Sequence, residues 1–204
     1  MRAALFVTCL ADTLFPQVGR ATVEILERVG VEVVFPVEQT CCGQLHRNSG
    51  YATEATELER RWARVFDPYD AIVTPSGSCA AHVRAHAGST GDRVWELSQF
   101  LVDRIGIVEL GSRFAGSVAY HPTCHSTRLL RVGDAPTRLL GAVTGLELVD
   151  LGDADECCGF GGTFAVKNAA VSSAMLGDKI RAIDASGADA VCACDASCLM
   201  HIGG

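Results

Sequence analysis

The sequence predicts an α/β protein made of two pseudo-repeated halves, each built on a Rossmann-like parallel sheet. Two observations lead to this prediction. Short apolar runs alternate with amphipathic segments, which is the pattern of parallel strands and crossover helices. A cysteine motif of the form C…CCG…SC also occurs twice, and a shift of 115 to 119 positions maps the first copy onto the second. Because such an internal repeat indicates two equivalent structural units, we expect two cysteine-rich domains, over residues 1–110 and 115–204.

The first half is expected to alternate strands and helices. The expected strands are 3–7, 31–35 and 70–74, and the expected helices are 18–29, 53–66 and 94–104. The run 3–7 is continuously apolar, as in a strand that is buried on both faces. Apolar residues recur at helical spacing over 18–29, and Gly30 follows as a helix C-terminal residue. A tight turn is expected over 75–79.

The second half repeats this order. The expected strands are 116–120, 146–150 and 188–192, and the expected helices are 135–143 and 164–186. Pro136 suits the first turn of its helix. We expect the long helix 164–186 to be weakest at Ser172 and Ser173 and to end at Gly187.

The composition excludes several classes of protein. Hydrophobic residues make up 49% and charged residues 20% of the chain, which are values of a folded globular protein. The net charge of −7 argues against non-specific nucleic-acid binding, which requires clustered Lys and Arg. The N-terminal apolar run is interrupted by Asp12 and lacks a cleavage site, and no stretch approaches the ~20 apolar residues of a membrane span. We therefore expect a cytoplasmic protein.

The cysteines of the repeat all follow predicted strands. They form two sets, Cys9, Cys41, Cys42 and Cys79 (the first set) and Cys124, Cys157, Cys158 and Cys198 (the second set). Loops beyond the carboxyl ends of parallel strands meet at one crevice, so each set is expected to gather at one point. Gly43 and Gly159 would let the backbone pass close to a bulky group. These eight cysteines are the predicted metal- and cofactor-binding residues, and no catalytic residue is predicted.

Four thiolates are the ligands of a [4Fe–4S] cluster or of a Cys₄ zinc site. An adjacent Cys-Cys pair favours a polynuclear cluster, since neighbouring side chains diverge, and paired zinc knuckles are not evident in the sequence. We expect one or two [4Fe–4S] clusters, with zinc in one site as an alternative. Cysteines that only pack in the core, a disulfide, or a dithiol–disulfide redox pair are further alternatives. Cys192 and Cys194 lie outside the repeat and are interpreted as core residues, or else as auxiliary ligands or redox thiols.

Histidines accompany the predicted sites. His121 and His125 flank Cys124, where a histidine can donate a hydrogen bond to a cluster sulfur. His46 and His201 stand in the corresponding loops. A role as exposed loop residues is the alternative for all of them.

The stretches CCGFGGTFAVK and SCLMHIGG, together with the first CCG element, resemble the cysteine-rich CCG-domain family. That family includes one of the subunits of heterodisulfide reductase and the glycolate oxidase iron–sulfur subunit, and the lactate-utilisation protein A group is its short form with two CCG domains. The resemblance covers the whole chain. It implies that the first and second sets bind iron–sulfur clusters. It also implies an electron-transfer subunit, itself non-catalytic, of a cytoplasmic complex that oxidises L-lactate, or a related 2-hydroxy acid, to the 2-oxo acid with partner proteins B and C.

The sequence departs from the fullest family pattern, C…CCG…C-x-x-C, at Ser76 and Asp195. Members with five cysteines per motif bind unusual non-cubane clusters at which thiol chemistry occurs. With four, simple one-electron transfer or a zinc-filled site is expected instead. A zinc-binding scaffold subunit and a thiol/disulfide redox protein are the alternative functions. The chain stops at Gly204, where related proteins run on, so a last strand and helix are expected to be missing.

Overall fold

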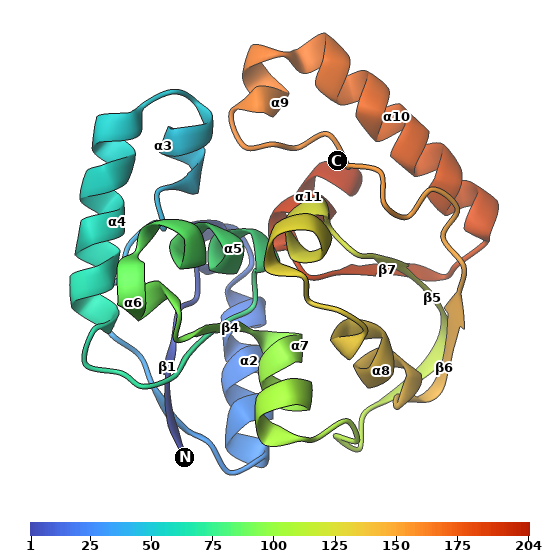
Figure 1. The fold of residues 1–204 in the computed structure, drawn as a ribbon. Helices are drawn as coiled ribbons and strands as arrows, with labels where there is room; N and C mark the ends of the chain where they lie inside the picture. The colour runs from blue at the N-terminus through green and yellow to red at the C-terminus, as the bar shows by residue number, and fades with distance from the viewer.

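A computed structural model describes residues 1–204. It contains a four-stranded sheet in the order β2-β1-β3-β4 and a three-stranded sheet in the order β6-β5-β7. Every strand pair is parallel. The two sheets lie in separate parts of the molecule, with β1 and β4 on one side and β5, β6 and β7 on the other (Figure 1). The predicted α/β class with two Rossmann-like halves is therefore confirmed.

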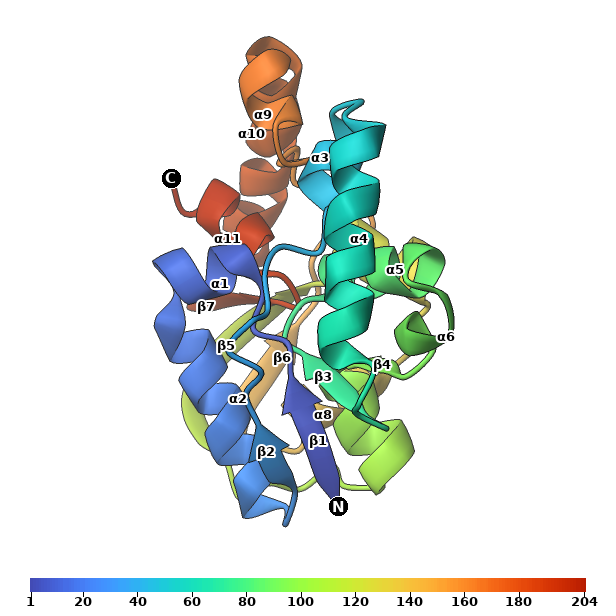
Figure 2. The same ribbon diagram turned by 90° about the vertical axis from the view of Figure 1, so that its left-hand side faces the viewer.

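The first half contains most of the elements. They are β1 (Arg2–Leu5), α1 (Cys9–Leu14), α2 (Pro16–Arg28), β2 (Glu32–Val34), α3 (Gln44–Asn48), α4 (Ala52–Phe66), β3 (Ile72–Thr74), α5 (Gly77–His86), α6 (Gly88–Gly91), β4 (Val94–Glu96), α7 (Leu97–Gln99) and the π-helical segment η1 (Phe100–Ile105). Helices α2 and α4 lie on opposite sides of the sheet (Figure 2).

The second half is smaller and follows the same order. Its elements are β5 (Arg113–His121), the π-helical segment η2 (Ser126–Leu130), α8 (Ala135–Gly141), β6 (Thr144–Val149), α9 (Phe164–Lys167), α10 (Ala169–Ser186), β7 (Ala190–Ala193) and α11 (Ala196–Ile202). Gly187 ends α10 in the left-handed conformation, as predicted. None of the helices of either half is both long and apolar enough to span a lipid bilayer.

The structure corrects two predictions in the first half. The segment 94–104 does not begin as a helix, because Val94, Trp95 and Glu96 form strand β4 beside β3. The predicted turn 75–79 is instead the start of helix α5, with Ser76 as its N-cap. Helix α5 has buried residues on several sides, so its sequence lacks the one-sided apolar pattern that identifies a surface helix.

A third correction concerns the long helix of the second half. It is interrupted at Asn168 rather than at Ser172, so that α9 and α10 are separate helices. Ser172 is buried inside α10, and its hydroxyl donates a hydrogen bond to the carbonyl of Gly159 at 2.9 Å. A partner for the hydroxyl removes the penalty expected for a serine at that place.

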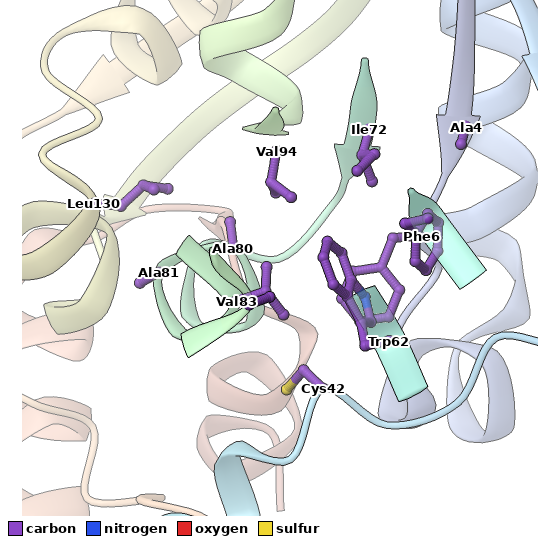
Figure 3. Close-up of a cluster of buried hydrophobic side chains, with 12 residues drawn as sticks. Ala4, Phe6, Cys42, Trp62, Ile72, Ala80, Ala81, Val83, Val94 and Leu130 are labelled. Carbon is purple, nitrogen blue, oxygen red and sulfur yellow. The ribbon is translucent and has the colours of Figure 1, made fainter. Parts of the chain in front are cut away.

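The core of the first half lies on both faces of its sheet. One apolar cluster contains Phe6, Trp62 and Phe66, whose rings pack at centroid distances of 4.7 to 5.5 Å. Cys42 lies at the edge of this cluster (Figure 3). A second cluster, which includes Leu26 and Phe100, covers the opposite face. The buried sheet thus provides a rigid support from which the cysteine-bearing loops leave.

Candidate metal centres

All eight predicted cysteines line one cleft between the two halves, so the structure brings both sets together. Each cysteine lies beyond the carboxyl end of a strand. Cys9 begins α1, and Cys79 and Cys198 lie in the first turns of α5 and α11. The two adjacent pairs lie in the loops that follow β2 and β6.

In the first set, Cys41 is the central sulfur. It accepts a hydrogen bond from the backbone N–H of Gly43 at 3.4 Å. Hydrogen bonds from the thiols of Cys42 and Cys9 lower the pKa of Cys41, and the same bonds raise the pKa values of the two donors. The Sγ atoms of Cys42 and Cys79 lie 3.5 Å apart. The hydrogen bonds therefore favour the thiolate form, which is the form that binds metal, at Cys41.

The second set repeats this arrangement around Cys157. The backbone N–H of Gly159 donates to the Cys157 sulfur at 3.4 Å, the distance found in the first set. Hydrogen bonds from the thiols of Cys124 and Cys158 lower the pKa of Cys157. The Sγ atoms of Cys124 and Cys157 are 4.0 Å apart. Each half thus provides one thiolate with thiol neighbours.

The glycine after each pair is required by the backbone. Gly43 and Gly159 have φ values of +96° and +90°, a region that other residues rarely adopt. A Cβ at Gly43 would lie 3.1 Å from the carbonyl oxygen of Ala55, and one at Gly159 would lie 2.6 Å from that of Ser172. The need for glycine was predicted, but its cause is close packing of the loop on the helix behind it.

The two positions that depart from the family pattern contact each other. The Ser76 hydroxyl donates to Asp195 Oδ1 at 2.5 Å, and these residues are the N-caps of α5 and α11. The Asp195 carboxylate also accepts from the Ser78 N–H at 3.1 Å, the Ser78 hydroxyl at 2.7 Å and the Thr123 hydroxyl at 3.2 Å. Asp195 is only 2% exposed, and burial raises its pKa. A buried carboxylate thus joins the two halves beside the cysteine cleft.

The histidines named from the sequence differ in their surroundings. His121 is 1% exposed, and one of its ring nitrogens lies within 4.8 Å of the sulfurs of Cys158 and Cys198. Burial lowers the pKa of His121 to about 4, so its imidazole is neutral at pH 7. His125 Nδ1 lies 3.5 Å from the Cys124 sulfur.

The other two histidines lie on helices next to the sites. His46 belongs to α3, which directly follows the first CCG turn, and its Nδ1 is buried without a hydrogen-bond partner. His201 belongs to α11 and shares a hydrogen bond of 3.2 Å with the Ser172 hydroxyl. His201 therefore supports the helix that packs on the second CCG turn.

Cys192 and Cys194 lie apart from the two sets and do not line the cleft. They border a separate apolar cavity of about 390 Å³ between α2, α8 and β7. The Cys194 sulfur lies 3.1 Å from the Tyr120 hydroxyl. Burial raises the pKa values of the Cys192 and Cys194 thiols. Neutral thiols in an apolar setting are poor metal ligands.

The donor chemistry of each set suits a soft metal ion, because four sulfurs of which one is already a thiolate favour zinc or iron. The separations of 3.5 and 4.0 Å match the edge of a tetrahedron around one ion, about 3.8 Å for metal–sulfur bonds of ~2.3 Å. An iron–sulfur cluster binds its cysteines through different irons, so the side chains would turn outward into the cleft to accept one. Both kinds of centre fit the residues present.

Comparison with known proteins agrees with the duplicated cysteine pattern. The family model of the cysteine-rich CCG domain matches residues 3–84 and again residues 118–203. The chain is similar to lactate utilization protein A of Geobacillus kaustophilus, with 48% identity over 100% of this chain and 91% of the relative. It is 48% identical to the protein of that name in an Exiguobacterium species, over 98% of this chain and 88% of the relative. The Bacillus pumilus protein of the same name is 42% identical over 100% and 91%.

Proposed function

The chain belongs to the cysteine-rich CCG domain family, and on that premise we propose that it is an iron–sulfur electron-transfer subunit. Its complex would be cytoplasmic and would oxidise L-lactate, or a related 2-hydroxy acid, to the 2-oxo acid together with partner proteins B and C. The observation that carries this proposal is the gathering of both four-cysteine sets in one cleft. The choice of lactate follows the name of the relatives that cover the whole chain.

In this proposal the eight cysteines of the two sets are the metal ligands. Hydrogen bonds from the neighbouring thiols lower the pKa values of Cys41 and Cys157, which favours the metal-binding thiolate form at these two positions. The N–H groups of Gly43 and Gly159 continue to donate hydrogen bonds to the Cys41 and Cys157 sulfurs when metal is bound. These hydrogen bonds stabilise the negative charge on the sulfurs and tune the reduction potential.

Burial separates the second cysteine of each CCG pair from water, whereas the first cysteine of each pair is half-buried. Cys42 and Cys158 are each 2% exposed. A bound iron–sulfur cluster would accept and release single electrons. Oxidation of a 2-hydroxy acid releases two electrons, a number that two one-electron centres in one chain can receive.

Replacement of the central thiolates tests the ligand assignment. We expect Cys41→Ser and Cys157→Ser each to remove the iron and sulfide of one set and to leave those of the other set in place. The measurement is iron and sulfide analysis, with the dithionite-bleached visible absorption, of protein isolated without oxygen. Cys192→Ser, outside the cleft, is the control and should keep both. Full iron in both single variants would contradict the assignment.

A zinc-binding scaffold is the second candidate function. The observation that favours it is the short separation of the sulfurs, 3.5 Å between Cys42 and Cys79, which already fits one tetrahedral ion. The same purification distinguishes the two functions. A colourless protein with about two zinc ions per chain, one for each cysteine set, would support the scaffold and overturn electron transfer.

A further inference from the structure

The two cysteine sets differ at one buried position. Phe6 lies three residues before Cys9, and His121 lies three residues before Cys124. Phe6 is part of the aromatic cluster of the first half, with its ring 5.5 Å from that of Trp62. The second half therefore places an imidazole where the first half places an apolar ring.

His121 has no structural partner that explains its burial. Its side chain is 1% exposed, and neither ring nitrogen makes a hydrogen bond of good geometry. Buried polar groups in folded proteins are almost always hydrogen-bonded, so an imidazole with two unpaired nitrogens points to a missing ligand.

The surroundings of the ring identify the kind of ligand. A ring nitrogen of His121 and the sulfurs of Cys158 and Cys198 lie within 4.8 Å of one another, and all three side chains are buried. The carbonyl of Ala154 lies near the ring and can accept the N–H of the other nitrogen once the ring is fixed. Metal-binding histidines commonly donate their second N–H to such a carbonyl.

The loop that carries this carbonyl is held in place by Lys179. Lys179 is only 1% exposed. Its Nζ donates to the carbonyl of Asp153 at 2.7 Å and lies 3.4 Å from the carbonyl of Ala154. The acceptor for the second nitrogen of His121 is therefore part of an ordered loop.

We propose that His121 is a nitrogen ligand of the metal in the second set, beside Cys158 and Cys198. The second set then offers five donors, four sulfurs and one nitrogen, whereas the first set offers four sulfurs. This inference rests on metal binding by the cysteines, which is part of the proposed function, but not on the metal being iron or on lactate as substrate.

A mixed sulfur and nitrogen ligand set has a redox consequence. Where the neutral imidazole takes the place of one of the four available thiolates on the metal, it reduces the negative charge of the ligand set, and such histidine ligation raises the potential of iron–sulfur centres. If both sets hold iron, the second set is the stronger electron acceptor. Electrons would then pass from the first set to the second.

X-ray absorption at the edge of whichever metal is bound tests the proposal, because it distinguishes nitrogen from sulfur ligands. The full-length protein isolated without oxygen is compared with His121→Phe, which copies the residue of the first half. We expect a nitrogen contribution in the unmodified protein and its loss in H121F, with metal lost from the second set only. His125→Phe is the matched control and keeps the nitrogen contribution.

A second variant covers the case in which H121F does not fold. His121→Cys keeps a ligand at the position, and we expect it to retain metal with sulfur ligands only. An unchanged nitrogen contribution in H121F or in H121C would overturn the proposal. The two proposals fail separately. Bound zinc with a nitrogen ligand would overturn electron transfer and support His121 as a ligand. An iron–sulfur protein without a nitrogen ligand would support electron transfer and overturn His121 as a ligand.

Discussion

The two halves build the same cysteine arrangement in different surroundings. The first sheet has four strands and apolar clusters on both faces. The second sheet has three strands, and β6 is largely exposed or half-buried along its length. Nevertheless the N–H···S distance is 3.4 Å in both CCG turns, and the φ values of the two glycines differ by only a few degrees. The arrangement is therefore specified by the turn and the helix behind it, and not by the size of the core.

The halves differ in how they fix the helix behind the turn. In the first half Arg47, which follows the turn, pairs with the buried Glu59 of α4 at 2.6 Å, and His82 contacts the same carboxylate at 3.0 Å. In the second half Ser172 of α10 bonds directly to the carbonyl of Gly159. One half uses an ion pair between a partly exposed arginine and a buried carboxylate, and the other uses a side-chain-to-backbone hydrogen bond for the same purpose.

Replacement of the two glycines is expected to have the largest effect on stability and to show how the packing behind the CCG turns differs between the halves. An alanine at either site would have to adopt the disfavoured positive φ of the glycine, which costs about 1–2 kcal/mol. Gly159→Ala also brings its Cβ to 2.6 Å from a backbone oxygen, against 3.1 Å for Gly43→Ala. We expect losses in the free energy of unfolding of about 3 kcal/mol or more for Gly159→Ala and about 2 kcal/mol for Gly43→Ala.

Urea unfolding and metal analysis measure both losses, and each variant should lose metal from its own set. Gly30→Ala is a suitable control, since its φ is also positive but no atom lies within 4 Å of the added Cβ. Equal losses in all three variants would show that close packing behind the turns is unimportant.

The sequence predicts the cysteine sets because their motif is local and parallel strands bring their loops to one edge. It does not predict the contact of Ser76 with Asp195, because these positions belong to different halves and the sequence does not show how the halves pack together. From the sequence, His121 is expected only to donate a hydrogen bond to a cluster sulfur or to be an exposed loop residue, and its burial is not expected. Only the folded structure shows that this ring is buried with neither nitrogen in a hydrogen bond of good geometry.

Helix α5 and strand β4 escape prediction for a different reason. The helix is buried on several sides, and the strand is only three residues long, so neither has a clear period in its sequence. Glu96 shows the same ambiguity, because it ends the strand and caps the helix that follows.

Strand β4 is a further difference between the halves, because the second sheet has no counterpart to it. Burial raises the pKa of Glu96 to about 7, although its carboxylate accepts hydrogen bonds from the N–H groups of Ser98 and Gln99. The Glu96 carboxyl holds its proton more tightly in the folded protein than in the unfolded chain, so its protonated form stabilises the fold. This stabilisation is complete at pH values below the pKa of the unfolded chain, near 4.5. This stabilisation is lost as the pH rises toward and through 7, by roughly 3 kcal/mol in all.

Glu96→Gln should remove this dependence, so that the free energy of unfolding changes less between about pH 5 and pH 8 than in the unmodified protein. Urea unfolding at each pH is the measurement. The exposed Glu57→Gln is the control and should keep the slope of the unmodified protein. A slope in Glu96→Gln that matches the control would place the pH dependence elsewhere.

The last and smallest effect concerns the junction of the halves, where the two arrangements meet. Asp195 accepts hydrogen bonds from Ser76, Ser78 and Thr123, all of which lie beside cysteines of the two sets. Asp195→Asn replaces one acceptor oxygen with a donor that faces other donors, so we expect a loss of about 2 kcal/mol in the free energy of unfolding.

Asp189→Asn is the matched control, because that carboxylate also accepts from a backbone N–H, at 2.8 Å, but is exposed and lies within one half. We expect the control to lose less than about 1 kcal/mol. If the two variants unfold at the same urea concentration, the carboxylate does not hold the halves together, and their alignment depends on the apolar contacts of α5 and η2 instead.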